Sequence, residues 1–182
     1  MTPPGPTPDD KRRARGAARL HAVQALFQAE ALGADVDRVA REFERHRFGE
    51  ALEEGEWAEA HVDLFRRVTS EAVTHQARID QMTDRALREG WAIARIDPTL
   101  RALFRAAGAE LVATATPPRV VIAEYMDVAD AFYPPLPPGP DDEEPRRAKE
   151  TALVNAVLDA MAREARPDAF RDRKAPPGAP AR

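Results

Sequence analysis

DPTLRALFRAAGAELVATATPPRVVIAEYMDVADAF, residues Asp97–Phe132, predicts two consecutive helices with clear starts. Asp97 and Pro98 supply an N-cap and a proline at the first helical position, and Pro117-Pro118 ends this helix and opens the next. Apolar side chains recur at helical spacing in both helices. The apolar face of the second helix is so broad that we expect this helix to be central and largely buried. These side chains are Leu100, Leu103, Phe104, Ala107 and Leu111, then Val121, Ile122, Tyr125, Met126, Val128, Ala129 and Phe132.

The same helical period continues on both sides of this segment. A first helix is expected to start at Asp9 or Asp10 as N-cap and to end at Gly33. Further helices are expected at 36–48, at 61–87 as one long helix or two joined by a kink, and at 148–165. The residues expected to face inward are Val36, Val39, Phe43 and Phe48, then Leu64, Phe65, Val68, Ala72, Ile79, Met82 and Ala86, and finally Leu153, Val154, Val157, Leu158 and Met161.

No stretch of the sequence alternates as a half-buried strand does. The sequence therefore predicts an all-α fold, a compact bundle of about six or seven helices. Fourteen of the 17 prolines fall in residues 3–8, 134–145 and 167–180, where they disfavour regular structure. We therefore expect a disordered tail at 1–10, a helical domain at 11–166 with a Pro-rich acidic loop at 133–147, and a second disordered tail at 167–182.

Composition and motifs exclude several classes of function. The 182 residues carry a formal net charge of −4 and contain no cysteine, so disulfides and thiolate chemistry are excluded and a reducing cytoplasm is favoured. No secretory signal and no membrane-spanning run is visible. No phosphate-binding glycine motif, nucleophile elbow or histidine spacing typical of a metal site occurs. We therefore expect no enzyme activity, no cofactor and no metal.

KRRARGAARLHAVQALFQ, residues Lys11–Gln28, begins as a basic segment and ends as an apolar one. On a helical wheel Arg12, Arg15 and Arg19 share a side with Val23 and Phe27, and unpaired arginines cannot enter a core with those two residues. We therefore expect the first half of the helix to extend past the core and to face a phosphate backbone, for which the arginine fork is well matched. The alternative is a solvated basic face. The basic residues are Lys11, Arg12, Arg13, Arg15 and Arg19.

Four segments in order resemble the NusB family of transcription antitermination proteins. ARLHAVQALFQ (Ala18–Gln28) after an arginine cluster resembles the family's opening helix. The segments that resemble its later helices are DPTLRALFRAAGAEL (Asp97–Leu111), PPRVVIAEYMDVADAF (Pro117–Phe132) and ALVNAVLDAMA (Ala152–Ala162).

The resemblance implies an all-helical, non-enzymatic protein that binds boxA RNA together with the ribosomal protein NusE. Such proteins act in the RNA polymerase antitermination complex during ribosomal RNA transcription. The resemblance assigns RNA binding to Lys11, Arg12, Arg13, Arg15, Arg19, Gln24 and Phe27. It assigns contact with NusE, and an extension of the RNA-binding surface, to the polar residues Arg101, Arg105, Glu110 and Asn155.

Each of these positions also has a structural interpretation. Arg105 and Glu110 are equally suited to ion pairs within the chain, and Asn155 to a bond with a neighbouring loop. Phe27 fits the core better than a base-stacking surface, and Glu124 is expected to be a polar anchor rather than a contact residue.

Departures from the family pattern leave other functions open. Leu153 stands where the family has an aromatic residue, and the insertion 133–147 places four acidic residues near the expected RNA surface. A protein–protein adaptor of the same fold with weakened or lost RNA binding is therefore the alternative function. The N-terminal domain of an RNA methyltransferase is a weaker one, since no methyl-donor domain follows. The sequence does not choose between a monomer and a homodimer.

Overall fold

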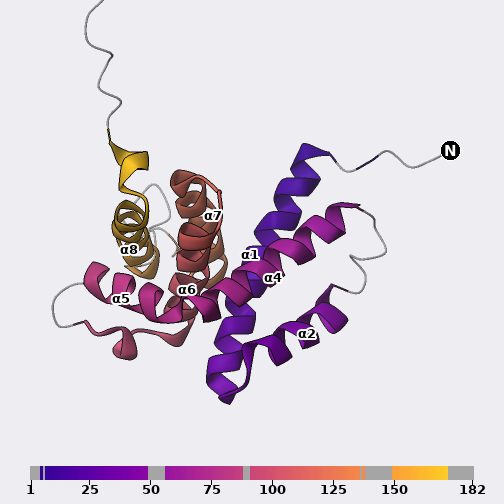
Figure 1. Cartoon of the computed structure of the whole chain (residues 1–182), viewed down its shortest axis with the longest axis horizontal. Helices are drawn as coiled ribbons and strands as arrows, with labels where there is room; N and C mark the ends of the chain where they lie inside the picture. Colours follow the sequence, from indigo (N-terminus) through magenta and orange to yellow (C-terminus); the bar gives the residue numbers. More distant parts are fainter. Residues whose placement is uncertain are drawn as a thin grey trace, which may run out of the picture.

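The computed structural model describes residues 5, 7–48, 56–87, 91–135, 137 and 149–171, with side chains from residue 62 onward in the helix that begins at Glu56. Within these residues it forms seven α-helices, two short 3-10 helices and no strand (Figure 1). The helices are α1 (Pro8–Leu32), α2 (Val36–Arg47), α4 (Glu56–Thr74), α5 (Gln76–Ala86), α6 (Pro98–Ala113), α7 (Pro118–Phe132) and α8 (Lys149–Ala165), with η1 (Ile93–Arg95) and η2 (Pro167–Phe170). The predicted all-α bundle is confirmed.

The start of α1 differs from the sequence prediction. Thr7, not Asp9 or Asp10, is the N-cap: its hydroxyl accepts a hydrogen bond from the Asp10 amide at 3.2 Å. The Asp10 carboxylate in turn accepts one from the Thr7 amide at 3.0 Å, which completes a capping box. Gly33 ends the helix as predicted, with a φ of 57° that favours glycine.

Ordered structure therefore reaches past both predicted ends of the domain. Residues 8–10 belong to α1, and 167–170 form η2. Apart from residues 5, 7 and 171, the rest of both predicted tails lies outside the described residues, and so does most of the predicted loop 133–147.

α6 is the central helix of the bundle, and this corrects the prediction that the helix at 118–132 holds that place. Ten consecutive or near-consecutive residues of α6 are buried, and the helix packs against α1, α4, α5, α7 and α8. α7 has a solvent-facing side that includes Arg119 and Asp127. Gly108 lets α5 approach α6 closely, because a Cβ atom at this position would overlap the side chain of Ile79.

The predicted segment 61–87 is two helices, as one of its two alternatives proposed. The break between α4 and α5 falls at His75, whose amide still donates to the Glu71 carbonyl at 2.9 Å. Phe65, Val68 and Ile79 are fully buried on either side of the break. The apolar face therefore continues through the kink and covers α1 and α6.

None of the described helices has the length and apolar character needed to cross a membrane.

Candidate nucleic-acid interface

Four exposed basic residues lie on the first turns of α1 and are called the basic arm below: Lys11, Arg12, Arg13 and Arg15. Asp9 and Asp10 in the first turn offset the unfavourable placement of cations at a helix N-terminus. Hydrogen bonds from Thr7 lower the pKa of Asp10, and the charge of Arg13 adds a smaller contribution. Arg12 Nη2 lies 3.7 Å from Asp9 Oδ1, and both side chains are highly exposed. This ion pair therefore contributes little to the stability of the arm.

Arg19 does not belong to the exposed arm. Only 4% of its surface is exposed, and its Nε and Nη2 donate to both oxygens of Glu110 at 2.9 and 2.8 Å. Its Nη1 donates to Oε2 of Glu124 at 2.6 Å. The prediction that Arg19 faces an external anion is therefore wrong, because two carboxylates of the same chain make its burial possible.

The charge state of Arg19 follows from these contacts. Burial alone would lower its pKa, but the hydrogen bond and charge of Glu110, with smaller contributions from Tyr125 and Glu124, outweigh burial and raise it. Arg19 thus stays charged and joins α1 to α6 and α7. Glu124 is the polar anchor that the sequence predicted.

A groove of about 490 Å³ runs beside the basic arm and is called the basic groove. Its lining includes the cluster formed by Arg19, Glu110 and Glu124, of which Arg19 and Glu110 are buried, and three of the arm's four cations. The turn between α6 and α7 and the start of α7 line it as well. The lining residues are Pro8, Lys11, Arg12, Arg15, Arg19, Leu64, Glu110, Thr116, Pro117, Val120 and Glu124.

Arg166 fixes the α6–α7 turn that helps to line this groove. Its guanidinium donates to the carbonyls of Leu111 and Thr116, each at 2.7 Å, and also to those of Glu110 and Thr114. Because the Glu110 carbonyl also accepts from the amide and the hydroxyl of Thr114, Arg166 adds to the hydrogen bonds that close the end of α6. The sequence pattern gives no indication of this role, because Arg166 follows the last predicted helix by a single residue.

Gln24 and Phe27 lie further along α1 and are absent from the lining of the basic groove. Phe27 is 39% exposed, so the expectation that it enters the core with Val23 is wrong. Gln24 is half-buried, and its Oε1 has no hydrogen-bond partner among the described residues. The structure thus places these two predicted RNA contacts apart from the arm.

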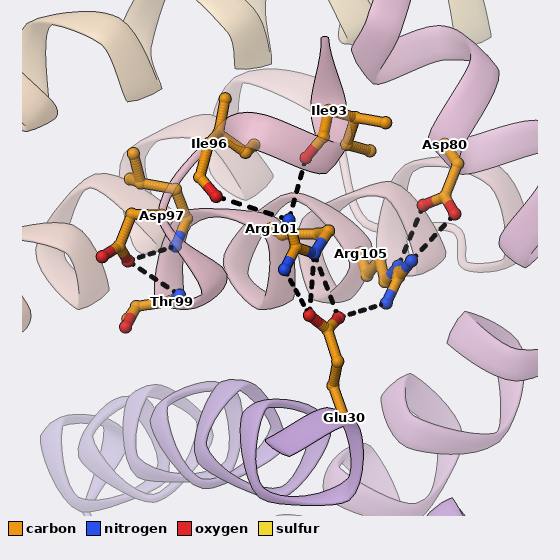
Figure 2. Close-up of polar contacts among 9 residues, drawn as sticks. Glu30, Asp80, Ile93, Ile96, Asp97, Thr99, Arg101 and Arg105 are labelled. Carbon is orange, nitrogen blue, oxygen red and sulfur yellow. Dashed lines mark hydrogen bonds and ion pairs between the residues drawn. The ribbon is translucent and has the colours of Figure 1, made fainter. Parts of the chain in front are cut away.

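Arg101 and Arg105 point toward acceptors of their own chain (Figure 2). Glu30 of α1 accepts from Arg101 Nε at 2.9 Å and from Arg105 Nη1 at 2.7 Å. Arg105 also forms a two-bond pair with Asp80 of α5, at 2.9 Å for each bond. Arg101 Nη1 donates to the carbonyls of Ile93 and Ile96, which secures η1.

These contacts match the structural interpretation of Arg105 and, in the lining of the basic groove, of Glu110. The side chains of Arg101 and Arg105 are only 14% and 18% exposed. The hydrogen bond that Arg101 donates is the largest cause that lowers the pKa of Glu30, and the hydrogen bond that Arg105 donates to Asp80 is the largest cause that raises the pKa of Arg105. The pairs hold α1, α5 and α6 together at the end of the bundle away from the arm.

A second groove, of about 610 Å³, lies between η1, the start of α6 and the first half of α8, and is called the Trp91 groove. Trp91 is 56% exposed, and the sequence pattern gives no indication of its role. Leu153, at the position where the family has an aromatic residue, lines this groove. Asn155 is exposed on the neighbouring face of α8. No group of residues suited to a metal ion occurs within the described parts of the chain.

Comparison with known proteins identifies relatives over most of the chain. The model of the NusB family matches residues 16–136. A transcription antitermination protein NusB from Rhodopseudomonas palustris (strain BisB18) is 42% identical over 168 residues, which cover 92% of each chain.

Solved structures agree at the level of the fold. The T. maritima NusB structure has a TM-score of 0.61 at 24% identity and covers 86% of this chain and 96% of its own. A structure of antitermination factors NusB and NusE in complex with dsRNA has a TM-score of 0.60 at 21% identity, and covers 84% of this chain and 98% of the matched one.

Proposed function

Because the chain belongs to the NusB family of transcription antitermination proteins, we propose that it binds boxA-type RNA through the basic arm, together with NusE. It acts within the RNA polymerase antitermination complex during ribosomal RNA transcription, and therefore in the cytoplasm. The family is not enzymatic, so the prediction that the chain is no enzyme is confirmed.

The single observation that supports RNA binding most is the state of the four arm cations. All are exposed and borne by one rigid helix, beside a groove large enough to receive a nucleotide. The arginines that serve the fold, such as Arg19, Arg101 and Arg105, are paired and largely buried instead. An RNA strand that follows the arm would meet cations whose N–H donors are available to its phosphate oxygens.

We assign the RNA contact to Lys11, Arg12, Arg13 and Arg15, and give Arg19 the role of a positioning residue at the groove. Gln24 and Phe27 are proposed to extend the same surface along α1, where the exposed ring of Phe27 is available for stacking. The structural relative with NusE and dsRNA supports this choice of partners at the level of the fold.

The experiment is a salt titration of RNA binding by the full chain, with and without NusE. A boxA RNA and a scrambled RNA of equal length are compared between 50 and about 300 mM salt. Four phosphate contacts predict that log K falls by about 3 for each unit of log salt, since each contact on a single strand contributes about 0.7. The proposal also requires tighter binding of boxA RNA than of scrambled RNA when NusE is present.

The alternative is a protein–protein adaptor that has lost RNA binding, and the Trp91 groove favours it. An exposed tryptophan beside an apolar-lined groove is typical of a protein contact. Weak RNA binding with little salt dependence, combined with tight NusE binding that Trp91→Ala abolishes, would support the adaptor over the RNA-binding factor. Analytical ultracentrifugation of the same samples separates a monomer from a homodimer.

A further inference from the structure

The basic groove is not basic on all sides. Lys11, Arg12 and Arg15 of α1 line the groove, and the carboxylate residue Glu124 of α7 lines it as well. A groove that served only to bind phosphates would not hold a carboxylate, because a carboxylate repels phosphate and has no hydrogen to donate. Besides its role as the anchor of Arg19, Glu124 therefore offers this groove an acceptor that suits a hydrogen-bond donor and not a phosphate.

Glu124 and Glu110 are arranged differently around Arg19. The side chain of Glu110 is fully buried, and both of its oxygens accept from Arg19. The side chain of Glu124 is 21% exposed, and one of its oxygens, Oε2, accepts from Arg19 Nη1. Its other oxygen, Oε1, has no hydrogen-bond partner among the described residues, so it is available to a group that enters the groove.

Arg19 holds this free oxygen in place. The guanidinium is locked by two hydrogen bonds to Glu110 and by burial, and its third bond fixes the carboxylate of Glu124. An acceptor fixed by a buried partner loses little side-chain entropy when it binds a ligand. It also binds a donor more strongly than a neutral acceptor would, because the hydrogen bond is charge-assisted.

A nucleotide offers such donors in two places. One is the 2′-hydroxyl group of ribose, which DNA lacks, and the other is the exocyclic amino group of guanine or adenine. We propose that Glu124 accepts a hydrogen bond from an uncharged nucleotide donor while Lys11, Arg12 and Arg15 bind the flanking phosphates. This inference rests on the proposed function and adds to it a residue that determines specificity.

The test uses Glu124→Gln in the full chain, with binding measured at one salt concentration. Three probes of the same sequence are compared: boxA RNA, the corresponding DNA, and boxA RNA in which inosine or purine replaces guanine or adenine. Loss of a charge-assisted hydrogen bond predicts that one preference of the wild type, for RNA over DNA or for natural over substituted bases, falls by about five- to tenfold. Which preference falls identifies the donor as the 2′-hydroxyl or a base.

Two control variants separate this effect from a change in folding or charge. Asp127→Asn removes one carboxylate from the exposed side of the same helix, outside the lining of the groove, so it should leave both preferences unchanged. Arg15→Ala should weaken all three probes by a similar factor, because phosphates are common to them. Ratios of affinities are used because they do not depend on the folded fraction of a variant.

The outcomes distinguish the inference from the function it rests on. If the wild type binds RNA with the expected salt dependence but Glu124→Gln leaves both preferences unchanged, the role of Glu124 is overturned and the proposed function stands. Losses in Asp127→Asn that match those of Glu124→Gln would likewise overturn it. If the wild type binds no RNA, both proposals fall.

Discussion

At the scale of single residues, Arg19 shows how far local pattern reasoning extends. The helical wheel correctly puts this arginine on the side of α1 that faces the core, and unpaired charge cannot be buried. Its partners are 91 and 105 residues away in sequence, so no local pattern reveals the pairing. The same holds for Arg101 and Arg105, whose bonds to Glu30 span 71 and 75 residues. The N-cap of α1, by contrast, could have been predicted from local sequence, because Thr7 and Asp10 have the spacing of a capping box.

The buried cluster should carry much of the stability. Arg19→Ala leaves Glu110 buried without a counter-charge, and we expect the free energy of unfolding to fall by about 3–5 kcal/mol. Chemical denaturation measures this change. The matched control is Arg66→Ala, which removes a two-bond pair with Glu44 from a side chain that is 59% exposed, and should cost less than about 1 kcal/mol. Equal losses of unfolding free energy in the two variants would contradict the idea that burial makes the Arg19 cluster more stabilising than an exposed ion pair.

Glu30 provides a pH-dependent contribution to stability. Its pKa is lower in the folded chain than the ordinary value of 4.5, chiefly because Arg101 donates hydrogen bonds to it. The stabilisation is therefore fully present above the ordinary pKa and is lost as pH falls through the lower, folded-state pKa. In thermal unfolding from pH 7 to pH 3, we expect Glu30→Gln to be less stable than wild type at pH 7 and the gap to narrow toward pH 3. A gap that is constant with pH would contradict this role.

At the scale of helices, proline, glycine and aspartate mark most boundaries. Asp97-Pro98 and Pro117-Pro118 correctly placed the starts of α6 and α7, and Gly33 the end of α1. The predicted end of α6 at Pro117 is wrong, because the helix already ends at Ala113 with Thr114 as its C-cap. The central position of α6 was not predicted, because a broad apolar face in α7 also fits a helix that packs on α6, α8 and α1. What distinguishes α6 is its content of small residues, which allows close packing on several sides.

Two glycines within helices test that packing. Gly108→Ala puts a methyl group into the side chain of Ile79 and 3.1 Å from Met161 Cε, and we expect it to destabilise the fold by about 1–3 kcal/mol. Gly16→Ala in α1 meets no atom within 4 Å, so the better helix propensity of alanine should stabilise the fold by about 0.5–1 kcal/mol. Thermal unfolding of both variants compares them, and the same sign in both would contradict the close approach of α5 to α6.

At the scale of the whole molecule, the separation of charges is the property that links fold to function. The chain carries 31 acidic and 27 basic residues, so its net field repels RNA at long range. The proposed RNA binding therefore depends on the local arrangement of the basic arm and the basic groove. Four segments in order were enough to predict the family and the fold. The two grooves could not be predicted, because each is lined by residues from distant parts of the chain.

The measurement that tests the role of the arm most directly compares two triple variants of equal charge change. Arg12/Arg13/Arg15→Ala removes three arm cations, and Arg38/Arg41/Arg45→Ala removes three exposed arginines from α2. With boxA RNA titrated across salt, the arm variant should bind at least about tenfold more weakly at low salt, and its salt slope should be shallower by about 2. The α2 variant should keep the slope of the wild type. Equal losses in both variants, or none in the arm variant, would contradict RNA binding by the basic arm.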